Sequence, residues 1–300
     1  MAYFPDNDDG FTTLQALCLS EAATALSASQ LLQWLPARSL SRTLAGPSRR
    51  FAARLAGFDH AITHRGLAQA AAEITQVWTS QLELHHRPPT ATGQPTLVVA
   101  NHPGLIDAAA LLSCLGGHEI RLLTADRPML AALPALAEHL IPVDSGHRGR
   151  ALRAARRHLA GGGTLVLFPA GRIEPDPAHA RDEARASLAG WSRSAAVLAR
   201  QVPGTRIVPV AIEGVIAPRA RRHLWIRATR GDPARRDWLA ATCQALCPDR
   251  YRIAPSVRFA SPVDAAGDIH TRLIDTMQAL YASARPNPAD ASRPRTSPPR

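Results

Sequence analysis

A histidine and an aspartate five residues apart are the strongest candidates for chemistry in this sequence. They stand in the segment NHPGLID as His102 and Asp107, after a short apolar run and before a helical pattern. Within one helix, a spacing of five residues would place the two side chains about 140° apart. They meet only if His102 lies in the turn before the helix and Asp107 lies in its first turn. Pro103-Gly104 supplies such a turn.

An aspartate bonded to one imidazole nitrogen fixes the tautomer and raises the basicity of the other nitrogen. The spacing therefore predicts a general base at His102 with Asp107 as its partner. A second interpretation fits the same segment. Asn101 would then cap the loop, His102 would be structural and Asp107 would cap the helix.

The elements around this segment must bring it to the edge of a sheet. Short apolar runs predict strands at 96–100, 120–124, 140–143, 164–168, 207–212 and 257–259. The patterns between and after them predict helices at 107–115, 129–139, 148–160, 187–201 and 269–281. This alternation is typical of an α/β fold with a mixed, mostly parallel sheet flanked by helices. Ligand sites gather at the carboxyl ends of such strands, where His102 is expected.

Three regions are expected along the chain. Residues 1–92 are predicted to form a helical N-terminal segment, in which Pro36 closes the first helix and 67–84 form one later helix. A linker rich in Pro, Gly and Thr at 87–95 leads into the α/β domain, predicted at 93–283. Residues 284–300 contain five Pro and little apolar bulk, which predicts a disordered tail.

Three further blocks follow the His–Asp segment in order. Residues 140–144 (LIPVD) read as a hydrophobic strand leading to an acid, 167–172 (LFPAGR) as a strand end with a Pro-x-Gly-Arg turn, and 207–212 (IVPVAI) as a Val-Pro-Val-type strand. Together the four blocks resemble the glycerolphosphate acyltransferase superfamily, which includes the lysophosphatidic acid acyltransferases. The resemblance covers roughly Thr96 to Pro262, and four blocks in order are far more specific than any one of them.

The resemblance implies an enzyme that moves a fatty acyl group from acyl-CoA or acyl-carrier protein to a lysophospholipid hydroxyl, above all that of 1-acylglycerol-3-phosphate. His102, paired with Asp107, would deprotonate that hydroxyl, without an acyl-enzyme, a metal or a cofactor. An oxyanion hole is required, and N–H groups around Gly104 or Gly171 are candidates. Arg172 would hold the acceptor's phosphate. The substrate-binding positions would be Gly104, Arg148, Phe168, Pro169, Gly171 and Arg172.

Two positions depart from the superfamily pattern. Ala170 stands where the third block usually has Glu, and Ser145 stands where the second block has Arg after its acid. Glu174 and Asp176 are candidates to replace the missing carboxylate as partners of Arg172. The departures leave open two alternatives: an acyltransferase for another lipid acceptor, such as an amino lipid, and a catalytically inactive lipid-binding relative.

The charge of the chain comes from an unusual source. All 35 Lys or Arg residues are Arg, and the formal net charge is +11. Arg makes bidentate contacts with phosphate, so the composition favours phosphate-bearing partners. Nucleic-acid binding is disfavoured because Arg is spread widely and no DNA-binding motif occurs. A metal hydrolase built on His102, Asp107, His118 and His139 is disfavoured because no HxH or HExxH spacing occurs.

A peripheral position at the cytoplasmic face of the membrane is expected. Residues 14–35 carry one charge, Glu21, but seven Ser, Thr or Gln residues, which makes them too polar for a membrane span. The first basic residue is Arg38, so the basic start of a signal peptide is missing. The four cysteines form no CxxC pair, which fits a reducing cytosol. Arginines of the helix 148–160, and Arg219, Arg221 and Arg222, are candidates to touch an anionic membrane.

Overall fold

The computed structural model describes residues 9–27, 29, 36–86, 93–116, 119–144, 146, 148–227, 229, 233–263 and 267–283. The predicted disordered tail at 284–300 lies outside these residues, as do residues 1–8 and most of the predicted linker. The predicted domain boundaries at 92 and 283 stay predictions.

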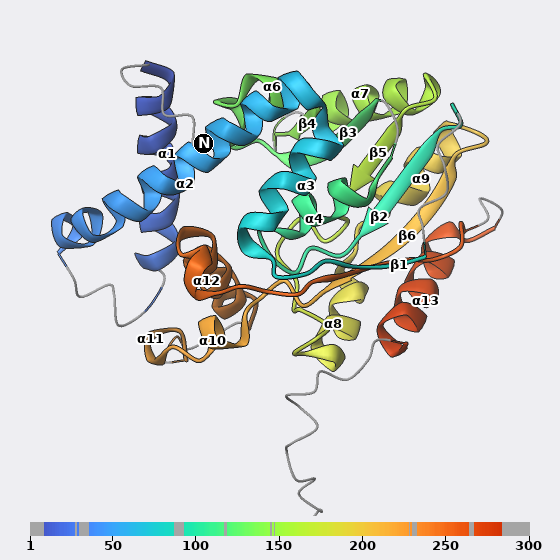
Figure 1. Ribbon diagram of the computed structural model, residues 1–300. Coiled ribbons are helices and arrows are strands. Elements are labelled where there is room, and N and C mark those ends of the chain that lie inside the picture. The colour runs from blue at the N-terminus through green and yellow to red at the C-terminus, as the bar shows by residue number, and fades with distance from the viewer. Residues whose placement is uncertain are drawn as a thin grey trace, which may run out of the picture.

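A mostly parallel sheet is the centre of the fold (Figure 1). Its order is β1-β7-β6-β2-β5-β3-β4. The strands are β1 (Glu83–His85), β2 (Thr96–Ala100), β3 (Ile120–Ala125), β4 (Leu140–Val143), β5 (Thr164–Leu167), β6 (Arg206–Glu213) and β7 (Ser256–Phe259). β2 pairs in parallel with β5 and β6, whereas β7 runs antiparallel to β6. The predicted α/β fold with a mixed, mostly parallel sheet is confirmed.

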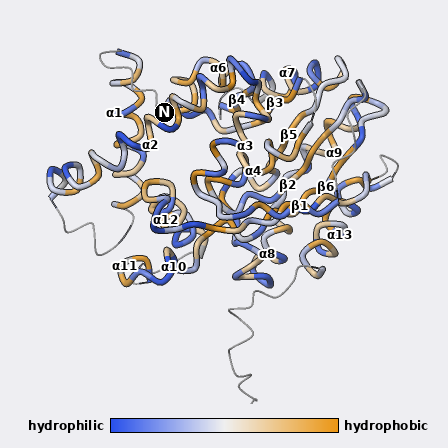
Figure 2. The backbone as a smooth tube through the Cα atoms, in the orientation of Figure 1, coloured by the Kyte–Doolittle hydropathy of each residue, from blue (hydrophilic) through white to orange (hydrophobic). Residues whose placement is uncertain are grey.

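Helices cover both faces of this sheet because its strands alternate between two apolar cores. Along β2, Val98 and Ala100 join a core with α3 (Leu67–Trp78) and α4 (Asp107–Cys114). Leu97 and Val99 join a core on the opposite face. That core is covered by α7 (Arg148–Ala160), α8 (Arg181–Ser187), α9 (Ser194–Gln201) and α13 (Ile269–Ala282). In Figure 2 the hydrophobic colour runs along β5, while many residues of α7 have the hydrophilic colour.

The N-terminal helices are joined to the sheet domain by hydrogen bonds as well as by apolar contacts. They are α1 (Asp9–Ser27), α2 (Ala37–Arg65) and α3. Trp78 Nε1 at the end of α3 donates to the carbonyl of Ala245 in α12 (Pro233–Leu246), at 3.2 Å. Asp59 of α2 accepts a hydrogen bond from the N–H of Leu136 in α6 (Pro134–Ala137), at 2.8 Å. The predicted helical N-terminal segment therefore packs on the α/β core.

Several predicted elements are divided or displaced, and proline explains one case. The helix predicted at 129–139 is two short helices, α5 (Pro128–Ala131) and α6, because the residue before Pro134 disfavours helical geometry. The helix predicted at 187–201 begins only at Ser194. The helix predicted at 67–84 ends at Trp78, and Glu83–His85 form β1. The short helices α10 (Pro218–Arg221) and α11 (Leu224–Arg227), and the longer α12, were not predicted.

Helix α1 covers only part of residues 14–35, the segment found too polar to span a membrane, and residues 28 and 30–35 lie outside the described part of the chain. Among the described residues, no helix has both the length and the apolar character that crossing a membrane requires.

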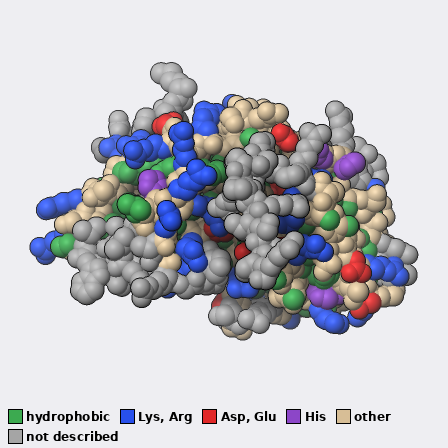
Figure 3. Space-filling model, turned by 90° about the horizontal axis from the view of Figure 1, so that it is seen from below, with side chains coloured by type: hydrophobic (Ala, Val, Ile, Leu, Met, Phe, Trp, Pro, Cys, Tyr) green, Lys and Arg blue, Asp and Glu red, His purple; other side chains and the backbone are tan. Residues whose placement is uncertain are grey.

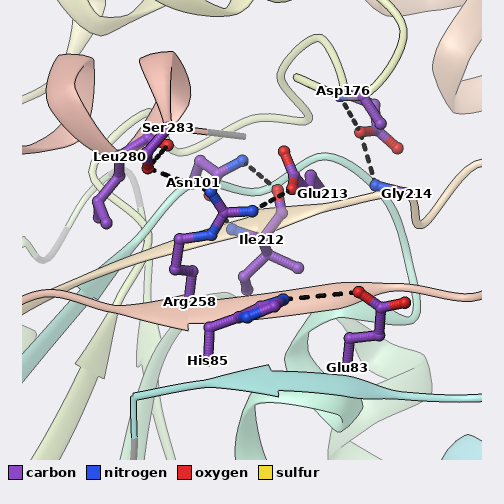
Figure 4. Close-up of polar contacts among 11 residues, drawn as sticks. Glu83, His85, Asn101, Asp176, Ile212, Glu213, Gly214, Arg258, Leu280 and Ser283 are labelled. Carbon is purple, nitrogen blue, oxygen red and sulfur yellow. Dashed lines mark hydrogen bonds and ion pairs between the residues drawn. The ribbon is translucent and has the colours of Figure 1, made fainter. Parts of the chain in front are cut away.

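Asn101 extends the pairing of β2 with β6 by one step. The last paired residue of β2 is Ala100, opposite Val210. Beyond it, the Asn101 amide donates to the Ile212 carbonyl and accepts from the Ile212 N–H, both at 2.8 Å (Figure 4). Asn101 is fully buried. Its side chain therefore takes the place of a strand residue and fixes the point where the chain leaves the sheet towards His102.

We expect Asn101→Ala to lower the free energy of unfolding by about 2–4 kcal/mol, because two buried backbone groups of Ile212 lose their partners. Denaturant unfolding measures this loss. Gln94→Ala is the matched control, since the Gln94 amide also reaches across the chain, to the Gly204 carbonyl at 3.1 Å, but in an exposed position. Gln94→Ala should lower the free energy of unfolding by less than about 0.5 kcal/mol. Equal costs for the two variants would contradict this account.

Candidate active site

His102 and Asp107 meet as their spacing predicts. His102 lies in the loop after β2, and Asp107 is the first residue of α4. The His102 Nδ1–H donates to Asp107 Oδ2 over 2.7 Å. The Asp107 side chain is fully buried, whereas 26% of the His102 side chain is exposed. The hydrogen bond on Nδ1 leaves Nε2 as the basic nitrogen, so the pair has the arrangement of a general base and its orienting carboxylate.

Backbone N–H groups also stabilise the Asp107 carboxylate. Oδ2 accepts from the Gly104 N–H at 3.2 Å, and Oδ1 accepts from the Ala108 N–H at 2.7 Å. Both donors belong to the first turn of α4 or to the loop before it, where unpaired N–H groups favour negative charge. A Cβ at Gly104 would stand 3.1 Å from Cγ2 of Val215, so a larger residue would disturb this turn.

The His102 ring is held on its face by Phe168, which follows β5. Their ring centroids lie 4.7 Å apart in a stacked arrangement. Burial lowers the pKa of His102, but the negative charge of Asp107, their hydrogen bond and the charge of Glu174 outweigh it. The pKa is therefore raised above its ordinary value, although Arg127 opposes the rise. A raised pKa makes the neutral ring a stronger base.

Glu174 and Asp176 are buried, and their contacts differ from the expectation. Glu174 accepts from the His102 N–H, and Asp176 accepts from the N–H groups of Gly214, Val215 and Ile216 at 2.8–3.1 Å. Figure 4 shows the Asp176 side chain directed at Gly214. No contact within the described residues joins either carboxylate to Arg172. The predicted pairing with Arg172 is therefore wrong, since both acids are already occupied by main-chain donors.

The third sequence block, residues 167–172, lies beside His102, because the carboxyl ends of neighbouring parallel strands meet at the same edge of the sheet. β5 is the neighbour of β2, so Phe168, Pro169, Gly171 and Arg172 follow at the same edge of the sheet. Gly171 has a φ of 62°, which favours glycine. Arg172 is exposed, and its Nη2 lies 3.9 Å from the place of a Cβ at Gly190. The predicted substrate-binding positions of this block therefore lie at the same edge of the sheet as the His102–Asp107 pair.

Arg148 is at a different place in the sheet. It is the first residue of α7, after β4, and its side chain lies outside what the structure describes. β5 and β3 separate β4 from β2. With about 4.8 Å between neighbouring strands, the ends of β4 and β2 are roughly 14 Å apart. Arg148 therefore begins its helix well away from His102 along the sheet edge.

The N–H groups of Gly104 and Gly171, both candidates for an oxyanion hole, have internal acceptors. The Gly104 N–H donates to Asp107, and the Gly171 N–H donates to the Phe168 carbonyl at 3.1 Å. Among the described residues, no group of three or more His, Cys, Asp or Glu is placed to hold a metal ion. His139, one of the ligands considered for a metal site, has its Nδ1 on the Ile120 carbonyl at 2.9 Å.

Comparison with known proteins bears on the reaction class. Residues 81–213 match the family model described as Acyltransferase, and this range contains all four sequence blocks. The chain contains an acyltransferase domain. The enzyme class and the family resemblance predicted from the blocks are therefore confirmed.

No curated protein matches the sequence of this acyltransferase. Among solved structures, it is similar to the 1-acyl-sn-glycerophosphate (LPA) acyltransferase PlsC from Thermotoga maritima. The two are 14% identical, and the match covers 94% of this chain and 97% of PlsC, with a TM-score of 0.46.

We expect His102→Ala to slow acyl transfer by roughly 10²–10⁴-fold, the usual contribution of a general base. Thiol release from the donor measures the rate, and thermal unfolding confirms that the variant is folded. His64→Ala is the control, since His64 is an exposed histidine on α2. A folded His102→Ala variant that keeps more than a few per cent of the rate would contradict the assignment.

Proposed function

We propose that this acyltransferase moves a fatty acyl group from acyl-CoA or acyl-carrier protein to the hydroxyl of a lysophospholipid, with His102 as general base. The observation that carries the proposal is the 2.7 Å hydrogen bond between a partly exposed imidazole and a fully buried carboxylate. That arrangement leaves one ring nitrogen available to a substrate and holds the other. The proposal needs no metal and no cofactor.

The chemistry follows from the free Nε2. It accepts the proton of the acceptor hydroxyl while the oxygen attacks the thioester carbonyl carbon. The C–S bond then breaks, the thiolate leaves, and the imidazolium returns the proton to the sulfur. Asp107 stabilises the imidazolium between these steps, because the buried carboxylate is already hydrogen-bonded to Nδ1. No nucleophile of the protein is involved, so no acyl-enzyme forms.

Arg172 supports an acceptor that carries a phosphate, above all 1-acylglycerol-3-phosphate. Its exposed guanidinium follows the strand next to β2, and the described contacts assign it no carboxylate partner. Such a group can form two parallel N–H···O contacts with phosphate. Ala170 favours a second candidate, an acyltransferase for an amine or hydroxyl of an amino lipid, because the usual carboxylate of this block is missing.

We further propose that the enzyme binds the cytoplasmic face of the membrane peripherally, through arginines. On α7, Ala151, Ala155 and Leu159 are buried while the arginines at 150, 153, 156 and 157 are exposed. Arg219 and Arg222 of the α10 region, which lies at the lower side of Figure 1 whereas α7 lies at the upper side, are also exposed. Figure 3, which shows the molecule from below, has Arg side chains gathered mainly on its left half. Arg221 differs, because it forms an ion pair with buried Asp237 at 2.9 Å. Exposed arginines attract anionic lipid headgroups.

Arg172→Lys tests the acceptor. Lys cannot reproduce two parallel contacts, so the KM for lysophosphatidic acid should rise about ten- to a hundredfold, the worth of a charged hydrogen bond. The KM for the acyl donor should stay nearly unchanged. The measurement is thiol release from purified enzyme with lysophosphatidic acid and amino lysolipids, using acyl-CoA and acyl-carrier protein as donors.

Arg200→Lys, at an exposed site on α9, is the matched control. Ala170→Glu should improve the use of phosphate acceptors if the missing carboxylate limits it. If Arg172→Lys changes both KM values equally, or neither, Arg172 is structural and the phosphate acceptor is rejected in favour of the amino lipid.

Membrane binding should weaken with salt, because exposed charges are screened within about 8 Å at physiological ionic strength and within less at higher salt. Co-sedimentation with vesicles of anionic phospholipid should fall as NaCl is raised, and vesicles of zwitterionic lipid should bind little. Protein that stays on the vesicles through high-salt and carbonate washes would show that binding is not electrostatic and would overturn the peripheral arrangement.

A further inference from the structure

Glu174 and His102 are joined by two hydrogen bonds in opposite directions, although they are 72 residues apart in the chain. The His102 N–H donates to Glu174 Oε2 at 3.0 Å, and the Glu174 N–H donates to the His102 carbonyl at 2.8 Å. This bridge connects the loop after β2 with the loop after β5. Both main-chain groups of the catalytic histidine are thus held by one residue.

The second oxygen of Glu174 has its own donors. Oε1 accepts from Trp191 Nε1 at 2.7 Å and from the Ser187 hydroxyl at 2.9 Å. Only 2% of Glu174 is exposed. A buried carboxylate is costly unless its oxygens are hydrogen-bonded, and here donors reach both of them. Both oxygens of the buried Glu174 carboxylate are therefore hydrogen-bonded, one of them to the main chain of His102.

We propose that Glu174 is a positioning residue for the acyl-transfer base: its carboxylate fixes the main chain of His102, and its negative charge strengthens the imidazole as a base. The inference rests on the proposed role of His102 and deepens it. It also gives this loop a carboxylate, although Ala170 stands where the block usually has one. Glu174 acts through His102 and not on the substrate.

The charges around the imidazole agree with this role. Asp107 from α4 and Glu174 from the loop after β5 both raise the pKa of His102, whereas burial and Arg127, just before α5, lower it. Burial raises the pKa of Glu174 itself. The hydrogen bonds from Trp191, the His102 N–H and Ser187, and the charge of His102, oppose that rise. Removing the Glu174 charge should therefore weaken His102 as a base.

Glu174→Gln removes the charge while keeping the size and one acceptor for the His102 N–H. The titration midpoint of the His102 imidazole, followed by NMR and assigned by its loss in His102→Gln, should move to lower pH. The acid limb of kcat/KM should move in the same direction, because the base stays neutral at lower pH. The plateau rate should fall about tenfold, because the hydrogen bond from the His102 N–H is no longer made to a charged group and the imidazole is a weaker base.

Trp191→Phe is a second variant in case Glu174→Gln does not fold. Without the indole N–H, the Glu174 carboxylate takes up a proton more readily and loses its charge. The titration midpoint of His102 should therefore move to lower pH, by a smaller amount than in Glu174→Gln. Trp78→Phe is the matched control, since it also removes a buried indole hydrogen bond but on the Ala245 carbonyl. In Trp78→Phe, the titration midpoint of the His102 imidazole should equal that of the wild type.

The NMR readout separates this inference from the proposed function. An unchanged His102 midpoint in Glu174→Gln and Trp191→Phe overturns the role of Glu174, whatever the activity. A loss of rate in which the His102 midpoint and the acid limb both stay at their wild-type pH also overturns it, because a purely structural role would give that result. A lowered midpoint that the acid limb does not follow supports the effect of Glu174 on the ring but overturns His102 as the base.

Discussion

The candidate active site depends on main-chain N–H groups that stabilise buried carboxylates. Asp107, Glu174 and Asp176 are almost completely buried, and none of them forms an ion pair with Arg among the described contacts. Each instead accepts hydrogen bonds from backbone N–H groups of the loops that follow β2, β5 or β6. Leaving one of these carboxylates unpaired would cost several kcal/mol. The three loops therefore hold one another in place.

This mutual support explains why a reactive ring can lie in a loop without being loose. Asn101 fixes where the chain leaves β2, Asp107 fixes one ring nitrogen, and Phe168 covers a ring face. The contacts of the ring with Asp107 and Phe168 come from different elements, so a rotation of the His102 ring would break both at once. The ring is thus oriented before any substrate arrives, which is what general base catalysis requires.

The sequence predicts what local patterns encode. Apolar runs located the central strands, and the Pro-Gly turn between His102 and Asp107 allowed the two side chains to meet, while the resemblance of the four blocks favoured that arrangement. The partners of Glu174 could not be predicted in this way, because they depend on β2 and β5 lying side by side in a sheet whose order is set by long-range packing. The distance between Arg148 and His102 could not be predicted either, because only the order of the strands in the sheet places β4 far from β2. Pro134, in contrast, was a local signal for the division of the predicted helix.

The donors to Asp176 are main-chain groups, and this has a consequence for how such enzymes can diverge. Every residue except proline offers the same N–H at positions 215 and 216, so the hydrogen bonds do not restrict which side chains stand there. Val215 and Ile216 are themselves buried, so the packing of their side chains, and not the hydrogen bonds, restricts which residues can stand there. Apolar residues of similar size can therefore replace one another at these positions while the loop keeps its path and its hold on Asp176.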